Sequence, residues 1–484
     1  MLAELTHRQE FWERRLRSPA VRGILGAAGY IPYGRLDRTT IAPVVGAGGG
    51  KGTRSVASYD EDTTTMAVEA ARLALRSLAP GTRVDLVTFS TVAPAYADKT
   101  NATAIHAALR LDDDVLALDL CGSQRSAAGA ILLALQGSGT VLAIASDLRT
   151  GLPGSGDEAS GGDGAAAVVV GDDAAGAPVI AELIGHASFT EEFVDRWRIP
   201  GEPRSKLWEE RFGETKYVPL GERAWREALK TAELSPDRVH RVIVTGLHSR
   251  AVRAVANRLG TTGDALGDEL TASIGNTGAA HPSLMLTAAL EAAAPGQVIA
   301  LVLLADGADV LVFRTTDAIA AWQPLRTVDV QRAAGAPVPY GKFLAWRGML
   351  PVEPPRRPEP PRISASAAGR SEEWKFGFVG QRDPTTGAPQ LPPRPSGRDP
   401  VPMADIPGTI VTFTFDRLAY SESPPIAFAV VDFDGGGRLP IELTDTAEAE
   451  VAVGGRVEMT FRKLFTSDGI HNYFWKAKLI RGAR

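Results

Sequence analysis

Short apolar runs alternate with amphipathic stretches along the N-terminal part of the chain. The runs at 86–90, 115–120, 141–146 and 242–245 have the length of strands buried on both faces of a sheet. Residues 62–77 predict a helix, because acidic residues precede a stretch that places Ala, Met and Leu on one face. This alternation predicts an α/β domain around a central sheet.

A short sequence echo runs through the same part. The triplets at 163–165 and 306–308 both read Asp-Gly-Ala, and each precedes a run of β-branched and apolar residues. The echo indicates two similar halves, each ending in a turn and a strand, or else a coincidence of common residue types.

The pattern changes after residue 405. Five segments there have the composition of short strands, and a Gly-rich turn at 434–437 joins two of them. The segments are 409–416, 426–433, 439–443, 456–461 and 473–479. Five short strands in so small a region are typical of an OB-fold barrel.

Proline marks the boundary between the two parts. Of the 33 prolines, 13 fall between residues 351 and 405, so this segment is expected to be a linker or an irregular extended region. We therefore expect an α/β domain over 20–335, a proline-rich segment over 336–405 and an all-β barrel over 406–484.

Composition narrows the classes of function. The net charge of −5 disfavours a binder of nucleic acid or anionic membranes, and the longest apolar run, at 298–305, is far shorter than the ~20 residues of a membrane span. Residues 1–20 carry many charged side chains and lack the apolar core of a signal peptide, so a cytoplasmic location is expected. The single cysteine, Cys121, excludes a disulfide within the chain and a zinc site built from cysteines.

Cys121 is itself a candidate nucleophile. It follows the predicted strand at 115–120 and precedes a helix of small residues at 126–135. The positive end of a helix dipole favours a thiolate, and the free N–H groups there can hold an oxyanion. A packed, inert cysteine is an equally good interpretation of this local pattern.

Other polar residues also stand at strand ends or helix starts. His248 follows a predicted strand and is suited to acid/base work, although capping its own helix is the simpler role. Asn276 lies in a Gly-rich loop, where it either donates its amide to a carbonyl oxygen or forms a turn. His281 is a second polar group of the site or merely a loop residue. Because the strand ends of such sheets converge, we expect Cys121, His248 and Asn276 to form one site.

Five motifs of the α/β region carry a family resemblance. They are Tyr-Asp-Glu-Asp-Thr at 59–63, Asp-Leu-Cys at 119–121, Gly-Asp-Gly-Ala-Ala at 162–166, Gly-Leu-His at 246–248 and Gly-Asn-Thr-Gly-Ala-Ala at 275–280. Together they resemble the thiolase superfamily, in the branch of 3-hydroxy-3-methylglutaryl-CoA synthase and 3-oxoacyl-ACP synthase III. The resemblance implies a five-layered αβαβα fold of two related halves, and a homodimer.

The resemblance also implies a role for each candidate residue. In that family the cysteine takes an acyl group from a thioester, and a His and an Asn assist carbon–carbon bond formation. Cys121 is then the acyl acceptor, His248 the acid/base and Asn276 the group that binds the thioester carbonyl. The implied substrate is an acyl-CoA or an acyl-ACP, with no permanently bound cofactor.

One position departs from the hydroxymethylglutaryl-CoA synthases, which use a glutamate base at a strand end. The matching stretch, 90–99, places Val92 at that position, and valine cannot take a proton. A Cys-His-Asn site without the glutamate is more similar to type III ketoacyl synthases, where His and Asn stabilise an enolate. We therefore expect an acyl-CoA-dependent condensing or acyl-transfer enzyme that forms a thioester on Cys121 and a carbon–carbon bond. The alternatives are a scaffold that channels acyl-CoA to a separate thiolase, and an enzyme that cleaves carbon–carbon bonds.

The C-terminal region carries a second resemblance. Its motifs at 408–414, 430–438 and 472–476 are similar to those of the OB-fold proteins that partner thiolases and hydroxymethylglutaryl-CoA synthases. Those proteins usually begin with a zinc ribbon of four cysteines, but the equivalent stretch, 378–394, has none, so we expect a relic ribbon that binds no zinc. The resemblance implies that the barrel holds acyl-CoA or bridges to a partner, a thiolase or an acyl carrier protein.

Overall fold

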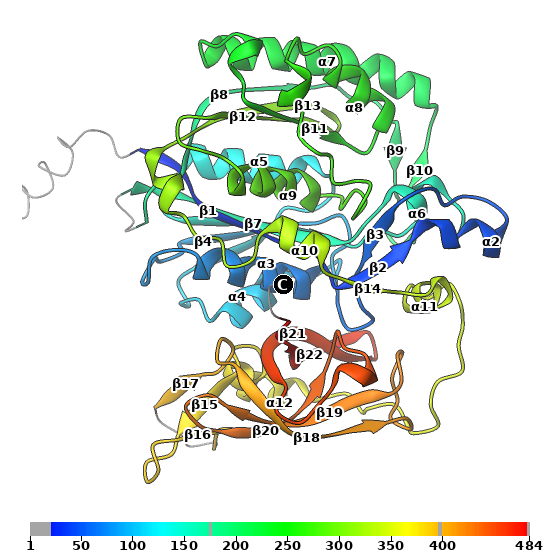
Figure 1. Cartoon of the computed structure of the whole chain (residues 1–484), viewed down its shortest axis with the longest axis vertical. Helices are drawn as coiled ribbons and strands as arrows, with labels where there is room; N and C mark the ends of the chain where they lie inside the picture. Colours follow the sequence, from blue (N-terminus) through cyan, green and yellow to red (C-terminus); the bar gives the residue numbers. More distant parts are fainter. Residues whose placement is uncertain (1–20, 174–176, 395–398, 482–484) are drawn as a thin grey trace, which may run out of the picture.

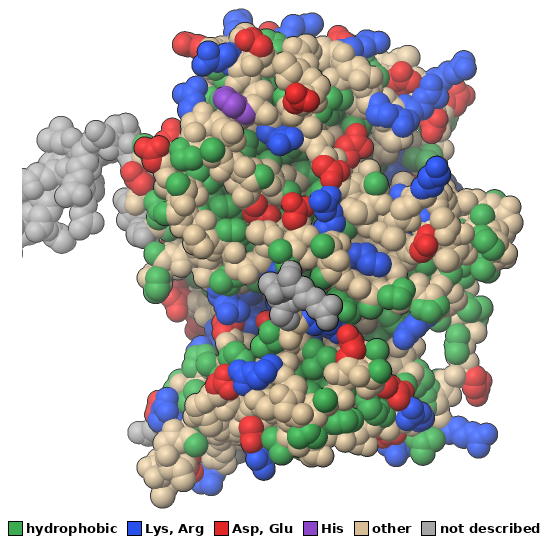
Figure 2. Space-filling model, in the orientation of Figure 1, with side chains coloured by type: hydrophobic (Ala, Val, Ile, Leu, Met, Phe, Trp, Pro, Cys, Tyr) green, Lys and Arg blue, Asp and Glu red, His purple; other side chains and the backbone are tan. Residues whose placement is uncertain are grey.

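The protein consists of an α/β domain and a β-barrel that lies below it in Figure 1. The computed structural model describes residues 21–173, 177–394 and 399–481, so the charged segment 1–20 lies outside the described residues. Among the helices of the described part, none is both long and apolar enough to cross a membrane. Figure 2 shows positive and negative side chains interspersed over the described part of one face, a pattern typical of a solvated surface.

Nine strands form the central sheet of the α/β domain. They are β1 Arg22–Tyr30, β4 Leu86–Ser90, β5 Leu116–Asp119, β6 Val141–Asp147, β7 Gly164–Asp172, β8 Ala181–Thr190, β11 Arg241–Gly246, β12 Val298–Leu304 and β13 Gly307–Thr315. Their order in the sheet is β11-β12-β13-β8-β1-β7-β6-β4-β5. The four apolar runs correspond to β4, β5, β6 and β11, but only β4, β6 and β11 are mostly buried. The expectation that the run at 115–120 is buried was wrong, because β5 is at the edge of the sheet and is half exposed.

The sheet consists of two halves with the same internal order. Outward from β1 lie β7, β6 and β4, and outward from β8 lie β13, β12 and β11. The strands β7 and β13, which begin at the glycines of the two Asp-Gly-Ala triplets, occupy equivalent places and run antiparallel to both neighbours. The halves join where β1 pairs with β8, at Gly23↔Glu182 and Ile24↔Ala181. The sequence echo therefore marks equivalent strands of two related halves.

Helices form three layers around these strands. The outer layers are α3 (Thr63–Arg76) with α4 (Ala102–Leu109), and α7 (Glu210–Thr231) with α8 (Ser249–Ala256), while α5 (Arg125–Gln136) and α9 (Ala280–Glu291) lie between the two halves (Figure 1). This confirms the expected αβαβα arrangement. Helix α3 begins at Asp62, which accepts the N–H of Thr65, and most of its side chains are buried because it packs on the sheet and also contacts the barrel.

The C-terminal region is a closed five-stranded barrel, as expected for an OB-fold. Its strands are β18 Gly408–Asp416, β19 Ile426–Phe433, β20 Arg438–Leu443, β21 Arg456–Ser467 and β22 Ile470–Leu479, in the order β18-β19-β20-β22-β21. The last two strands are longer than the sequence pattern predicted, because they pair with each other as a hairpin out to Ser467↔Ile470.

The start of the proline-rich segment packs on the α/β domain. β14 (Ala336–Pro337) pairs with β2 (Gly34–Asp37), and α11 (Tyr340–Trp346) buries Phe343 in a cluster with Val56. Because these residues bury apolar surface against the first domain, we propose that this domain extends to about Met349, beyond the boundary expected at 335.

The rest of the proline-rich segment contains a small sheet. β15 (Val379–Arg382) pairs with β16 (Pro389–Gln390) and β17 (Pro400–Pro402). Asp383 closes the turn after β15 by accepting the N–H groups of Thr385 and Thr386 at 2.9 and 2.8 Å. Within the described ranges, no group of three or more His, Cys, Asp or Glu side chains is arranged to hold a metal ion. We propose that this sheet is the relic of the ribbon, held by hydrogen bonds.

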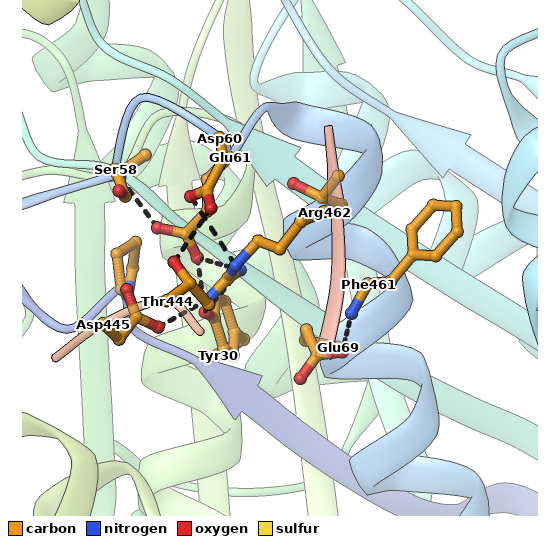
Figure 3. Close-up of polar contacts among 12 residues, drawn as sticks. Tyr30, Ser58, Asp60, Glu61, Glu69, Thr444, Asp445, Phe461 and Arg462 are labelled. Carbon is orange, nitrogen blue, oxygen red and sulfur yellow. Dashed lines mark hydrogen bonds and ion pairs between the residues drawn. The ribbon is translucent and has the colours of Figure 1, made fainter. Parts of the chain in front are cut away.

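Buried charges join the barrel to the α/β domain. Arg462 of β21 is fully buried and bonds with Glu61 at 2.6 Å, Asp445 at 2.5 Å and the Tyr30 hydroxyl at 3.2 Å (Figure 3). Buried charges are tolerated where they are paired and hydrogen-bonded, so this junction depends on a specific geometry.

Candidate functional site

A cavity of about 880 Å³ lies at the carboxyl ends of the sheet strands, and both Cys121 and His248 line it. Strand β5 ends at Asp119, just before Cys121, and β11 ends at Gly246, just before His248. Strand ends converge at one edge of such a sheet, which brings these distant segments together. The volume is within the ~300–1,000 Å³ of small-molecule sites.

Cys121 lies exposed at the turn from β5 into α5. The next residue, Gly122, has φ 113°, which residues with a Cβ rarely adopt, and its N–H donates to the Thr91 carbonyl at 3.2 Å. The glycine thus allows the sharp turn that presents the thiol to the cavity.

The thiol is not activated by nearby charges. Partial burial raises the pKa of Cys121, and the carboxylates of Asp119 and Asp147 raise it further. A thiolate is the reactive form of cysteine, so these effects work against ionisation of the Cys121 thiol.

His248 both caps α8 and lines the cavity. Its Nδ1 accepts the N–H of Ala251 at 3.1 Å, and its Nε2 lies 2.8 Å from the carbonyl oxygen of Glu210. An accepting Nδ1 requires the proton on Nε2, so the ring is the neutral Nε2–H tautomer and a donor at that nitrogen. His248 therefore caps its own helix and also lines the cavity, and its acid/base role stays a prediction.

Asp195 and Tyr217 line the same cavity, although sequence reasoning singled out neither of them as a site residue. The Tyr217 hydroxyl donates to the Asp195 carboxylate at 3.3 Å, and the Tyr217 ring lies 5.9 Å from the ring of His248. Burial raises the pKa of Asp195. The signal in the sequence was the mixed charged and aromatic run at 195–198, which lies outside the five motifs that carry the family resemblance.

Asn276 lies behind this cavity and lines a smaller one of about 250 Å³. Its Nδ2 donates to the Gly246 carbonyl at 3.1 Å, while its Oδ1 accepts from Gln124 Nε2 at 3.2 Å and from the Gly278 N–H at 3.0 Å. The structure thus brings Cys121 and His248 into one cavity and places Asn276 in the adjoining wall, with its amide engaged.

His281 also lines the smaller cavity and is almost fully buried. Its Nδ1 accepts the N–H of Thr277 at 3.3 Å, and its Nε2 donates to the carbonyl of Glu269 at 3.1 Å. Burial lowers the pKa of His281 to about 4, so the ring is neutral. In this geometry His281 holds the loop that carries Asn276.

Val92 lines the larger cavity directly after β4. Its N–H donates to Asp147 at 2.8 Å, and its carbonyl accepts from Arg198. Asp147 is fully buried and also accepts from Thr91 at 2.9 Å and from the Ala279 N–H at 2.6 Å. This carboxylate therefore ties the end of β4 to the start of α9.

The barrel contacts the wall of the larger cavity. Tyr96 lines the cavity, and its hydroxyl accepts the N–H of His471 from β22 at 2.8 Å. The two rings lie 5.2 Å apart. The C-terminal domain thus supports the loop that carries Val92.

The family comparison identifies the two parts of the chain separately. The model of the ChsH2 C-terminal OB-fold domain matches residues 400–462. The α/β domain is similar to the hydroxymethylglutaryl-CoA synthases of Aeropyrum pernix, at 31% identity over 68% of this chain and 95% of the relative, and of Methanopyrus kandleri, at 30% identity over 61% and 88%.

Solved structures show the same fold. MvaS in complex with 3-hydroxy-3-methylglutaryl coenzyme A matches with a TM-score of 0.56 at 19% identity, over 69% of this chain and 93% of that protein. The 3-oxoacyl-(acyl carrier protein) synthase III of Pseudomonas aeruginosa matches with a TM-score of 0.52 at 21% identity, over 61% and 98%. Because its sequence identity to the synthases extends over nearly their whole length, the chain belongs to the hydroxymethylglutaryl-CoA synthase family of the thiolase superfamily, and it carries a C-terminal OB-fold domain of the ChsH2 type.

Proposed function

We propose that the protein is an acyltransferase in which Cys121 takes the acyl group of a thioester and a carbon–carbon bond then forms on that group. The observation that carries the proposal is the shared cavity of Cys121 and His248 in a member of a family of thiolase-like, acyl-CoA condensing enzymes. Relatives of known structure were solved with CoA or 3-hydroxy-3-methylglutaryl coenzyme A, and we propose acyl-CoA, or an acyl-ACP, as the substrate here.

The tautomer of His248 suits it to donate a hydrogen bond. The Nε2–H of His248, which donates to the Glu210 carbonyl, would instead donate to the oxygen of an enolate. The amide of Asn276 would donate to the same oxygen once its hydrogen bond to Gly246 is broken. Because Val92 offers no base, the carbanion of the second substrate is proposed to arise by decarboxylation, in which the bond to its carboxylate carbon breaks, CO2 leaves and the electron pair stays on the attacking carbon. The same groups serve bond cleavage in the reverse direction.

Intact-protein mass spectrometry tests the first step. Incubation with acetyl-CoA and other acyl-CoAs is expected to add one acyl group to the wild-type chain and none to Cys121→Ala. A folded wild-type protein that gains no adduct from any donor would refute the proposal. We place this chemistry in the cytoplasm, where a free thiol stays reduced.

A scaffold role is the second candidate, and the contact between Tyr96 and His471 favours it. Through this contact the barrel reaches the wall of the cavity, which suits a chain that hands acyl-CoA to a separate thiolase or acyl carrier protein. If Cys121→Ala leaves the flux through a reconstituted thiolase reaction unchanged, the scaffold role is supported over catalysis at the thiol.

We propose that the chain forms a homodimer through β5. This strand is at the edge of the nine-stranded sheet, and Leu116 and Leu118 are 56% and 41% exposed on it. Unpaired edge strands with apolar side chains are sites of association.

A further inference from the structure

The smaller cavity behind Cys121 is cationic. The charged side chains in its wall are four arginines and two carboxylates: Arg38, Arg149, Arg196, Arg253, Asp157 and Glu269. Arginine stays protonated in proteins, and His281 in the same wall is neutral. The wall therefore has an excess of positive charge before any ligand is bound.

Much of the donor capacity of these arginines is unused. Arg196 pairs with Asp157 and Arg38 donates to the Thr271 carbonyl, whereas the half-buried guanidinium of Arg149 forms no hydrogen bond or ion pair with any residue of the described ranges. Arg253 is exposed, and water can satisfy its donors. The Nε atoms of Arg38 and Arg196 are buried and have no acceptor among the described residues. Buried donors without acceptors are rare in folded proteins. The donors that a ligand in the cavity can reach are those of Arg149, which lines the wall without a partner among the described residues.

The arginine cavity adjoins the catalytic one. Arg149, Arg196 and Leu247 line both cavities, and Cys121 and His248 line the larger one with them. At about 250 Å³ the smaller cavity is below the ~300–1,000 Å³ of drug-sized ligand sites. It suits the far end of an acyl chain and is too small for a whole coenzyme A.

We propose that the acyl group transferred to Cys121 ends in a carboxylate, which the arginines of the smaller cavity bind. The acyl donor is then a monothioester of a dicarboxylic acid. The inference rests on the proposed function and names its substrate class. In the transfer, the Cys121 sulfur bonds to the thioester carbonyl carbon, the carbon–sulfur bond to CoA breaks, and CoA leaves as a thiol with the proton of Cys121, while the distal carboxylate is unchanged.

The test compares two donors of equal chain length, glutaryl-CoA and valeryl-CoA, which differ in the terminal carboxylate. Binding to the full-length Cys121→Ala protein is measured by isothermal titration calorimetry. We expect glutaryl-CoA to bind at least about 10-fold more tightly, as charge-assisted hydrogen bonds allow. Adding Arg149→Gln should remove this preference, whereas Arg226→Gln, which removes an exposed guanidinium on α7 outside both cavities, should keep it.

Two results would overturn the inference. The first is equal affinity of the two donors for Cys121→Ala. The second is an equal loss of affinity for both acyl-CoA donors in Arg149→Gln, which would mean that the arginine binds the phosphates of CoA. If Arg149→Gln fails to fold, Arg149→Lys replaces it, and it should weaken glutaryl-CoA binding more than valeryl-CoA binding.

Acylation of the wild-type chain separates this inference from the proposed function. Mass spectrometry after incubation with each donor should show faster labelling of Cys121 by glutaryl-CoA. A preference for glutaryl-CoA in binding without any labelling would support the carboxylate site and refute acyl transfer. Labelling by both donors at the same rate, with equal affinities, would support acyl transfer and refute the carboxylate site.

Discussion

Replacing Arg462 by methionine removes a buried positive charge from the junction between the barrel and the α/β domain. The wild-type guanidinium has no exposed surface and bonds with Glu61 at 2.6 Å, Asp445 at 2.5 Å and Tyr30 at 3.2 Å (Figure 3). Methionine keeps much of the side-chain length, so the main effect is to leave two carboxylates buried without their partner.

The expected cost is about 3–5 kcal/mol of unfolding free energy, because removing one member of a buried ion pair leaves the other uncompensated. The cost should increase with pH. Burial already raises the pKa of Glu61 to about 7, so in the variant Glu61 takes up a proton at low pH and avoids an unpaired charge. Above neutrality the ionised form is the one that must be buried.

Urea unfolding of the full chain, followed by tryptophan fluorescence to which the buried Trp475 contributes, measures this cost. Arg438→Met is the matched control, since Arg438 pairs with Asp432 on the exposed surface of the same barrel and such pairs are worth under about 1 kcal/mol. Adding Glu61→Gln to Arg462→Met should recover part of the loss. If Arg462→Met is as stable as Arg438→Met at pH 8, the buried charges do not hold the two domains together.

Three further variants test other parts of the structure. Burial alone would raise the pKa of Glu69, but nearby cations, first of all Lys478, hold it at about 2. Ionised Glu69 therefore stabilises the fold above about pH 4.5, and this stability is lost as the pH falls toward 2. In urea unfolding at a series of pH values, Glu69→Gln should show a smaller loss of stability over that range than the wild type. Val92→Glu should let the acetyl group on Cys121 exchange its methyl protons for deuterium, as read by mass spectrometry, and a deuterium content equal to wild type would contradict the placement of Val92. Leu118→Lys should shift a dimer to monomers in sedimentation velocity, and a wild-type monomer would rule out the dimer.

Local pattern was sufficient for most strands and for the position of the thiol. The apolar run at 86–90 and the alternating segment at 426–433 coincide with β4 and β19. The signal for a strand is local, because it consists of the periodicity of its own side chains and the turn residues that flank it. The position of Cys121 at a turn is also a local signal, because a residue between a strand and a following helix of small residues lies at the turn that joins them. His248 and Asn276 were placed at strand and loop ends for that reason too.

The relation between these residues required the tertiary structure. Asn276 lies behind the wall of the cavity that holds Cys121 because its amide bonds to Gly246 and Gln124, and no local pattern specifies such partners. The arginines of the smaller cavity likewise come from segments far apart in the chain.

The sequence by itself determined the two folds, the family and the candidate nucleophile, because these depend on periodicity and short motifs. Only the tertiary structure decided that Arg462 bonds with Glu61, 401 positions away, and that Arg149 and Arg196 line both cavities. The physical reason is that the burial and pairing of charges are long-range properties. The cost of burying a guanidinium is set by the groups that topology brings around it, and the residues next to it in the chain do not reveal them.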